Sequence, residues 1–413
     1  MDDNHEQFEN CPEIEAEVKN KRRIGFIKSV LGKLGLLLTG ALIALLIVPN
    51  ALSMYLSNDS AYGKLVALQN VVRRFYVDAD EVDETVLNDM MATGYIYGLG
   101  DPYSAYLNEE TYSSILYSNE GGTSGVGVTV VFDPETSAIY VVRVSEESPA
   151  AQAGLQSKDR ITAVDSIAVT AENYDQSVNN IRGESGTDVT LTLLRDGETF
   201  DVTVTRGDFT ATSVYSRMIG TVCLIEITDF NTATTDQFKA ALDEAVASGA
   251  TGLIFDLRGN TGGLVDVTSD MLDMLLPKGE IGYAIYNGGK RVSLAKSDAK
   301  EIDLPMAVLT DGDTASASEY FALALRDYEK AALIGEKTFG KGIMQSTMPL
   351  GDGSAVRVTV AKFYTKSGTE FHGVGLAPDR EVKIDQSTSS RFLLADSDEP
   401  VIQAAIDYLN SVK

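Results

Sequence analysis

The stretch TASASEY, Thr314–Tyr320, places three hydroxyl side chains within five positions, directly before the apolar, helix-forming segment FALALRDY. A serine hydroxyl beside a base can act as a nucleophile in acyl transfer. A purely structural interpretation also exists, because Ser316 and Glu319 have the S-x-x-E spacing of a capping box, which satisfies the free amides of a helix's first turn. These seven residues alone leave both interpretations open.

Histidine and cysteine are scarce, which restricts the possible chemistry. The chain has two histidines, His5 and His372, and two cysteines, Cys11 and Cys223, far apart in sequence. These residues provide no disulfide framework, zinc spacing or iron–sulfur pattern, so we predict no metal site and no cofactor. His372 follows TKSGTEF in a loop, where we expect a structural role and not a catalytic one.

The length and charge of the chain limit its architecture and its partners. A chain of 413 residues predicts two or three domains. The 34 Lys and Arg against 60 Asp and Glu give a formal charge of −26, which disfavours nonspecific binding to nucleic acid. We therefore expect no nucleic-acid partner.

The N-terminal region has the pattern of a membrane anchor. Residues 21–33 carry five basic side chains, and no charged residue follows from Leu34 to Leu56, a length that can cross a bilayer as a helix. The basic cluster predicts a cytoplasmic tail at 1–33, a transmembrane helix at 34–56 and the rest of the chain on the extracytoplasmic side of the cell membrane. A cleaved signal peptide is the alternative, but no good small-x-small site follows the apolar run.

Two regions of different composition follow the predicted anchor. Residues 57–112 have apolar spacings typical of helices, interrupted by the turn GLGDPYSAYL, whose simplest role is that of a connector. Residues 113–207 contain short Val/Ile runs and turn residues, with two short helical segments, PAAQAGL and YDQSVNNIRG. This pattern predicts a small strand-rich domain, which ends in two strands around an Asp-Gly turn.

From residue 208 to 385 strands and helices are expected to alternate. Strand-like runs such as TGLIFDLRG, PMAVLTD and AALIGE are separated by helical segments, which predicts an α/β core with a mainly parallel sheet and crossover helices. Functional groups in such sheets gather where strands end and helices begin. The segments DLRGNTGG and TDGDTASASE both occupy junctions of this kind. Residues 386–413 end in a short amphipathic helix, expected to serve in packing or self-association.

The motifs occur in an order that resembles the carboxyl-terminal processing proteases, also called tail-specific proteases. The likeness covers residues 60–385 and rests on LGDPYSAYL, SPAAQAGL, IRGESGT, DLRGNTGG, TASASEYFALALRDY, IGEKTFGKGIMQ and TVAKFYTKSG. It implies a crotonase-like α/β protease core, a PDZ domain at 113–207 and a Ser/Lys dyad. It also implies that Ser316 is the nucleophile, Lys341 the general base and Gln345 the residue that orients the lysine.

The setting of Lys341 suits a lysine that must be neutral to act as a base. An apolar, partly desolvated site lowers the pKa of a lysine. The residues that flank Lys341 are Phe339, Gly340, Gly342, Ile343 and Met344. With so few histidines in the chain, lysine is the natural candidate for the base. An ordinary surface lysine in a glycine turn is the alternative.

The resemblance also implies an oxyanion hole near the start of the helix after Ser316. One donor would be the amide of Ala317, and the other would come from the turn Gly262-Gly263, with Gly262 as the expected donor. Glycine lets a backbone approach a substrate closely. This chain has Thr261 where the family usually has proline, so the role of the loop is better supported than the choice of donor.

For the PDZ domain, the resemblance implies capture of a substrate's C-terminal carboxylate by amides around Gly125, Val126 and Gly127, with the peptide added as a strand. Arg182 resembles an arginine that couples the PDZ domain to the core in some relatives; a surface arginine is the alternative. In QSKDRI this chain has Ser157 and Lys158 where relatives commonly carry a Pro-Gly turn.

These observations predict a membrane-anchored, extracytoplasmic serine endopeptidase that cleaves protein or peptide substrates with flexible C-terminal ends. A homodimer through the terminal helical regions is compatible with the resemblance. One alternative is a catalytically inactive scaffold that binds protein tails. A second is an enzyme of crotonase-like architecture that acts on an acyl thioester, which would not account for the PDZ segment.

Overall fold

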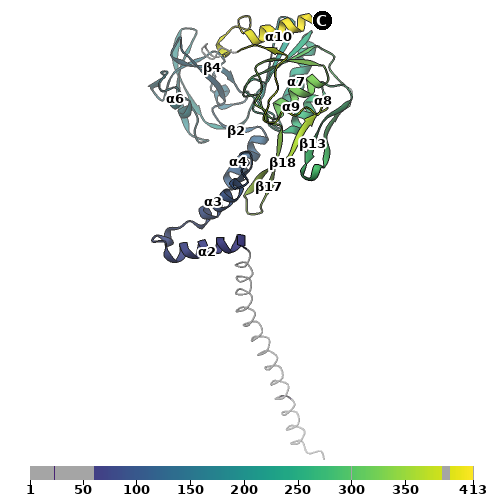
Figure 1. Ribbon diagram of the computed structural model, residues 1–413. Helices are drawn as coiled ribbons and strands as arrows, with labels where there is room; N and C mark the ends of the chain where they lie inside the picture. The colour runs from purple at the N-terminus through teal and green to yellow at the C-terminus, as the bar shows by residue number, and fades with distance from the viewer. Residues whose placement is uncertain (1–22, 24–59, 299, 384–390, 413) are drawn as a thin grey trace, which may run out of the picture. The chain divides into compact units, whose positions relative to one another are not determined.

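The computed structural model describes residues 23, 60–298, 300–383 and 391–412 (Figure 1). The chain forms two compact units, residues 1–88 and 89–413. The transmembrane helix expected at 34–56 lies outside the described residues, as does all of the expected tail except Arg23. Among the residues that are described, every helix is too short or too polar to cross a membrane.

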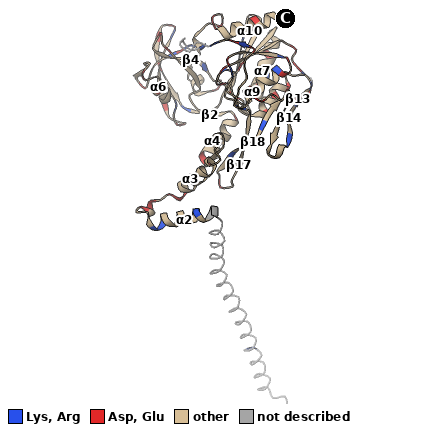
Figure 2. Cartoon of the chain, viewed as in Figure 1, with Lys and Arg blue, Asp and Glu red and all other residues tan. Residues whose placement is uncertain are grey.

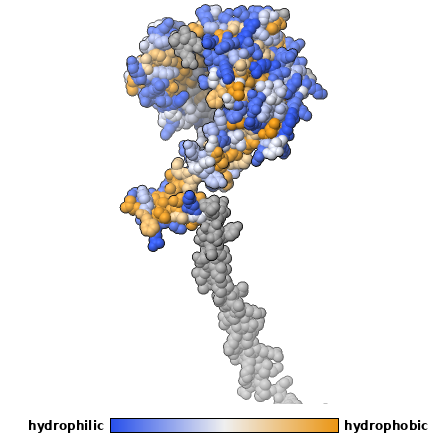
Figure 3. Space-filling model, in the orientation of Figure 1, coloured by the Kyte–Doolittle hydropathy of each residue, from blue (hydrophilic) through white to orange (hydrophobic). Residues whose placement is uncertain are grey.

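Residues 60–119 are mainly helical, as their apolar spacing predicts. They are α2, Ser60–Phe75, α3, Glu84–Tyr97, and α4, Glu109–Asn119. In α2 the apolar side chains of Leu68, Val71 and Phe75 are exposed, and Figure 3 shows hydrophobic residues gathered over this helix. The helix α4 begins after Asn108, whose side chain accepts a hydrogen bond from the Thr111 amide, and it runs across the domain boundary expected at residue 112.

Residues 122–210 form the predicted strand-rich domain with two helices. Its antiparallel sheet has the order β3-β4-β5-β7-β8, with β6 beside β5, and a separate pair joins β2 to β9. The strands are β2, Gly122–Gly125, β3, Val128–Asp133, β4, Ala138–Val144, β5, Arg160–Val164, β6, Ile167–Ala168, β7, Asp188–Arg195, β8, Glu198–Thr205, and β9, Gly207–Thr210. The helices are α5, Pro149–Gln152, and α6, Tyr174–Ile181. Asp196 and Gly197 both have positive φ angles, as a tight turn between two strands requires.

The core contains the predicted mainly parallel sheet, in the order β10-β11-β12-β15-β16-β19. Only the β10–β11 pair is antiparallel. The strands are β10, Val214–Ile219, β11, Val222–Ile227, β12, Gly252–Asp256, β15, Met306–Thr310, β16, Ala331–Gly335, and β19, Arg380–Glu381. Every residue of β12, β15 and β16 is buried, because helices cover both faces of the sheet.

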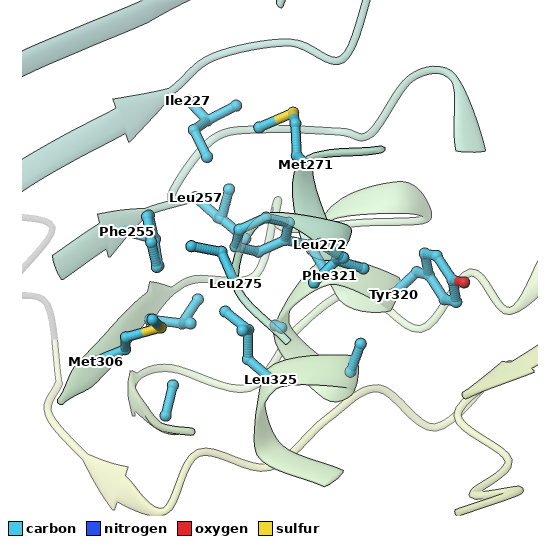
Figure 4. Packing of buried hydrophobic residues seen from close by; sticks show 14 of the residues in the cluster. Ile227, Phe255, Leu257, Met271, Leu272, Leu275, Met306, Tyr320, Phe321 and Leu325 are labelled. Atoms are coloured by element: carbon cyan, nitrogen blue, oxygen red, sulfur yellow. The ribbon is translucent and has the colours of Figure 1, made fainter. Parts of the chain in front are cut away.

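An apolar cluster covers each face of this sheet. On one face Phe255 and Met306 pack with residues of α7, Thr234–Ala247, α8, Val265–Asp273, and α9, Ala317–Asp327 (Figure 4). On the other face Ile254 and Leu309 pack against α10, Pro400–Ser411. The C-terminal helix therefore packs against the sheet.

A second, antiparallel sheet was not expected from the sequence. It has the order β1-β18-β13-β14, with β17 also paired to β18. Its strands are β1, Ala105–Leu107, β13, Gly279–Tyr286, β14, Arg291–Ser297, β17, Ile343–Pro349, and β18, Ala355–Thr365. The strand β1 lies within the region expected to be helical, because it follows the turn at residues 98–103 and pairs with β18. Acidic and basic residues alternate along the backbone of the strand-rich domain and the core (Figure 2).

Candidate active site

Ser316 lies between β15 and α9, at the carboxyl end of a central parallel strand. Its backbone has φ 59° and ψ −117°, a conformation that costs free energy in a residue other than glycine and is typical of functional sites. Asp311 stabilises the preceding turn, since its Oδ1 accepts hydrogen bonds from the Gly259 and Thr314 amides, each at 3.0 Å. The nucleophile candidate is therefore held by both junction loops.

Glu319 connects the segment of Ser316 to the segment of Lys341. Its side chain is fully buried. Oε2 accepts hydrogen bonds from the backbone N–H of Ser316 at 2.9 Å and of Lys341 at 2.7 Å. Oε1 accepts from Thr338 Oγ1 at 2.6 Å and from the Gly340 amide at 2.8 Å. The carboxylate that the capping-box spacing predicts at the helix start thus also fixes the loop of the candidate base.

Lys341 is half-buried, and the pKa of its ammonium is lowered from the ordinary value of 10.5. Burial is the main cause, and the nearby Arg357 guanidinium adds to it, whereas Asp101 acts in the opposite direction. Within the described residues no hydrogen bond joins Lys341 Nζ to Ser316 Oγ; the amine lies 5.1 Å from the ring centre of Tyr103. A lower pKa, which favours the neutral amine, is what a lysine base requires.

Gln345 lies on β17 at an irregularity in its pairing with β18, between Met344 and Gln345. Its Nε2 donates to Thr359 Oγ1 at 3.2 Å. Over the described part of the chain, no hydrogen bond joins it to Lys341. The residue is therefore on the strand that follows the candidate base, with its amide directed to a neighbouring strand.

The glycine turn expected to supply an oxyanion donor packs directly against Ser316. Gly262 has φ 109°, and a Cβ there would lie 2.9 Å from Ser316 Cβ and 3.0 Å from the Ala317 amide nitrogen. However, the N–H of Gly262 donates to Asn260 Oδ1 at 2.8 Å, so this amide already has an acceptor. The N–H groups of Gly263 and Ala317 have no acceptor among the described residues. The turn Gly262-Gly263 thus lies beside Ser316 and Ala317 through Gly262, while Thr261 is exposed.

The three residues predicted to bind a peptide carboxylate line a groove of about 980 Å³. Gly125 ends β2, and the carbonyls of Val126 and Gly127 accept from the Ala150 and Ser145 amides. The N–H groups of Val126 and Gly127 have no acceptor in the described ranges. They are available to a carboxylate.

Arg182 lines the same groove, but its side chain is exposed and makes no ion pair with any described carboxylate. Instead, Arg143 of β4 joins the strand-rich domain to the core: its Nη2 lies 2.8 Å from Glu226 Oε1 of β11. The side chains of this pair are 13% and 7% exposed. Nothing in the sequence pattern distinguishes Arg143 from other strand arginines.

The structure also describes the remaining positions that the sequence singled out. Lys158 has φ 77° and Ser157 Oγ donates to the Val142 carbonyl, so the turn that lacks Pro-Gly is held by other contacts. His372 is half-buried with its ring edge-on to Tyr103 at 6.5 Å. No group of three or more His, Cys, Asp or Glu side chains that could hold a metal is found in the parts of the chain that the structure describes.

Together these features suit acyl transfer. A serine lies at the start of a helix, a lysine whose backbone shares an acceptor with that serine has a lowered pKa, and two amides lack acceptors within the described residues. The sequence pattern indicated Ser316, Lys341 and the glycine turn. It did not indicate the second role of Glu319, the Arg143 ion pair or the contact of Tyr103 with the lysine.

Comparisons with known proteins match two parts of the chain to family models. Residues 221–382 match the model for peptidase family S41, and residues 125–205 match that for a PDZ domain. The chain is 33% identical over 397 residues to the carboxyl-terminal-processing protease of Synechocystis sp., a match that covers 90% of this chain and 91% of that protein. It is 33% identical over 344 residues to the carboxy-terminal processing protease CtpA of Bacillus subtilis, with 82% and 73% covered.

The fold is also found among solved structures. The crystal structure of a Bacteroides fragilis protein assigned to the S41 proteases aligns with a TM-score of 0.58 at 17% identity. The alignment covers 84% of this chain and 97% of that one. At this identity the likeness concerns the fold.

Proposed function

Because the chain belongs to the carboxyl-terminal-processing proteases of peptidase family S41, we propose that it is a serine endopeptidase that cleaves protein substrates near their C-terminal ends. In this proposal Ser316 is the nucleophile and neutral Lys341 is the general base. The observation that supports it most directly is the shared carboxylate of Glu319, which binds the backbone amides of both residues.

The proposed reaction proceeds in two stages through an acyl-enzyme. Ser316 Oγ attacks the scissile carbonyl while Lys341 Nζ takes the hydroxyl proton and then passes it to the leaving amine. The amide of Ala317 and an amide of the turn Gly262-Gly263 stabilise the negative charge on the carbonyl oxygen. Lys341 then activates a water molecule, which hydrolyses the acyl-enzyme and regenerates the serine. Gln345 is proposed to orient the lysine amine.

The PDZ domain is proposed to bind the substrate's C-terminal carboxylate and to regulate access to the site. The amides of Val126 and Gly127 lack acceptors among the described residues and lie in a groove that a peptide strand could fill beside β3. Arg182 lines that groove and is proposed to sense its occupancy. The ion pair of Arg143 with Glu226 offers a direct mechanical link from this domain to the core.

The chain is further proposed to be a single-pass protein of the cell membrane with its catalytic part on the extracytoplasmic side. The support is the basic cluster at 21–33 followed by the uncharged run at 34–56. The test is to fractionate cells that express either the full chain or a variant without residues 1–56. Only the full chain should sediment with membranes. A homodimer through the terminal helices can be tested by sedimentation of the purified full chain.

The dyad is tested by cleavage of an unfolded protein by the purified full chain in detergent. Ser316→Ala and Lys341→Ala should each lower the rate by at least about 10³-fold, because nucleophile and base act as a unit. Lys337→Ala is a matched control, since Lys337 is exposed in the same loop. Full activity of either variant would falsify the dyad. Tail binding without cleavage by the unmutated chain would favour the alternative function, an inactive PDZ scaffold.

A further inference from the structure

The turn from Asp101 to Ser104 is attached to the strands beside the candidate base, and is not a simple connector. Asp101 Oδ1 accepts from the Tyr103 amide at 3.1 Å, and its Oδ2 accepts from Ser104 Oγ at 2.6 Å. Ser104 Oγ in turn accepts from the Thr359 amide of β18 at 3.1 Å. The side chain of Thr359 is the acceptor of the Gln345 amide. The turn is thus fixed to the sheet that carries Gln345.

This attachment places the ring of Tyr103 under the amine of Lys341. The distance from Nζ to the ring centre is 5.1 Å, within the range of about 6 Å for a cation–π interaction. The ring of His372 also lies near it, with the two ring centres 6.5 Å apart. Nζ has no hydrogen-bond acceptor among the described residues, so the ring face is the contact that holds it.

The charged groups around this amine act in opposite directions. Arg357 on β18 disfavours the charged amine, and Asp101 in the turn favours it. The Glu319 carboxylate accepts a hydrogen bond from the backbone amide of Lys341. His372 contributes to lowering the pKa of Asp101. A cation–π contact with Tyr103 favours the charged amine, as Asp101 does, because an aromatic ring attracts an ammonium and not a neutral amine.

We propose that Tyr103 is a positioning residue that holds the protonated amine of Lys341 over its ring, away from Ser316, and releases it when the proton leaves to solvent. The inference rests on the proposed role of Lys341 as the base. Once the amine is neutral, the attraction to the ring is lost and Nζ is free to accept a hydrogen bond from Ser316 Oγ. Tyr103 thereby couples the position of the base to its protonation.

The test is the pH dependence of kcat/KM for cleavage of an unfolded protein by the full chain. Tyr103→Leu removes the ring, so the charged amine loses its stabilisation and the acidic limb should move about half a pH unit downward. Tyr103→Phe keeps the ring and should keep the limb in place. Tyr95→Leu, at an exposed tyrosine of α3, controls for loss of a tyrosine elsewhere. If Tyr103→Leu does not fold, Tyr103→Met replaces it.

A second measurement separates this inference from the dyad itself. The rate of acylation of Lys341 by a small amine-reactive reagent, followed by mass spectrometry in the Ser316→Ala background, reports the protonation of Lys341 without any catalysis. Tyr103→Leu should move this titration downward by the same amount. The proposal is overturned if the titration does not move, if Tyr103→Phe moves it equally, or if only the plateau rate falls. Cleavage by Lys341→Ala would instead refute the dyad.

Discussion

The backbone N–H groups of Ser316 and Lys341 donate to one and the same oxygen, Oε2 of Glu319, at 2.9 and 2.7 Å. Lys341 lies 22 positions after Glu319 in the sequence, so a single buried atom holds together two segments that are distant along the chain. The spacing between the backbones of the proposed nucleophile and the proposed base is therefore fixed by this carboxylate.

Glu319→Gln should impair both stability and activity. The amide side chain keeps one acceptor oxygen and turns an NH₂ group toward donors, so at least one buried amide loses its partner. Hydrogen bonds to a charged group contribute about 1.5–3 kcal/mol, so we expect a loss of about 3 kcal/mol in the free energy of unfolding in urea. We expect kcat to fall by about 10²-fold, because small misplacements of catalytic groups are costly.

Glu244→Gln is the matched control for this change, since Glu244 is exposed on α7. It should leave both quantities unchanged. Glu319→Gln with the activity and stability of the unmutated protein would show that the shared carboxylate does not position the site.

Gly262→Ala should lower kcat by about 10²-fold or more. A methyl group there would lie 2.9 Å from Ser316 Cβ and from the Ala315 carbonyl oxygen, and the φ of 109° is unfavourable for alanine. Gly259→Ala is the control, because Gly259 also has a positive φ in the same loop but faces open space. Equal losses in the two variants would mean that backbone strain, and not the contact with Ser316, determines the effect.

Arg357→Gln should move the acidic limb of the pH profile toward higher pH. Arg357 lowers the pKa of Lys341, so its removal raises that pKa and leaves less neutral amine at a given pH. Below the limb, activity should fall about tenfold for every pH unit by which the limb moves. Lys362→Gln changes an exposed cation of the same strand and should leave the profile in place. An unchanged profile in Arg357→Gln would contradict the assignment of Lys341 as the titrating base.

The ion pair of Arg143 and Glu226 should couple the PDZ domain to the core. In a double-mutant cycle of Arg143→Met and Glu226→Gln, we expect a coupling energy of about 1–3 kcal/mol in unfolding. Each variant should reduce the response of the cleavage rate to a tail peptide while leaving peptide affinity, measured by calorimetry, the same. The pair of Arg160 and Asp133, within the PDZ domain, is the control and should leave that response intact.

Substrates with a free C-terminal carboxylate should be cleaved faster than the same substrates with an amidated end. The amides of Val126 and Gly127 are the proposed donors, and loss of a charge-assisted hydrogen bond costs about 1.5–3 kcal/mol, so we expect KM to rise by at least about tenfold. The control is a substrate that presents an internal loop and has no free C-terminal end. If amidation changes nothing, capture of the tail by the PDZ domain is excluded.

Local patterns in the sequence were sufficient to predict two kinds of element: strands buried on both faces, and hairpins whose two strands are neighbours in sequence. The runs that became β12, β15 and β16 are continuous and apolar because both faces of the sheet are covered. The hairpin of β7 and β8 followed from its Asp-Gly turn. By contrast, the sheet around β18 joins strands that are distant in sequence, and no local pattern specifies which strand pairs with which.

The same distinction applies to the candidate site. The hydroxyl of Ser316 and the glycine-rich setting of Lys341 were visible as motifs. The acceptor of the Gly262 amide, Asn260 Oδ1, depends on a side-chain orientation that the sequence does not encode locally. The contact between Tyr103 and Lys341 depends on long-range pairing, since the turn before β1 is bonded to β18 through Ser104 and Thr359.

The hydrogen bonds of Glu319 also have a consequence for the chain before it is folded. Their donors lie at the start of α9 and in the segment from Thr338 to Lys341, so the arrangement exists only after these two segments have docked around a buried carboxylate. A newly made chain therefore contains every reactive group but no assembled site. On the proposed mechanism, peptidase activity therefore arises only when this part of the chain folds.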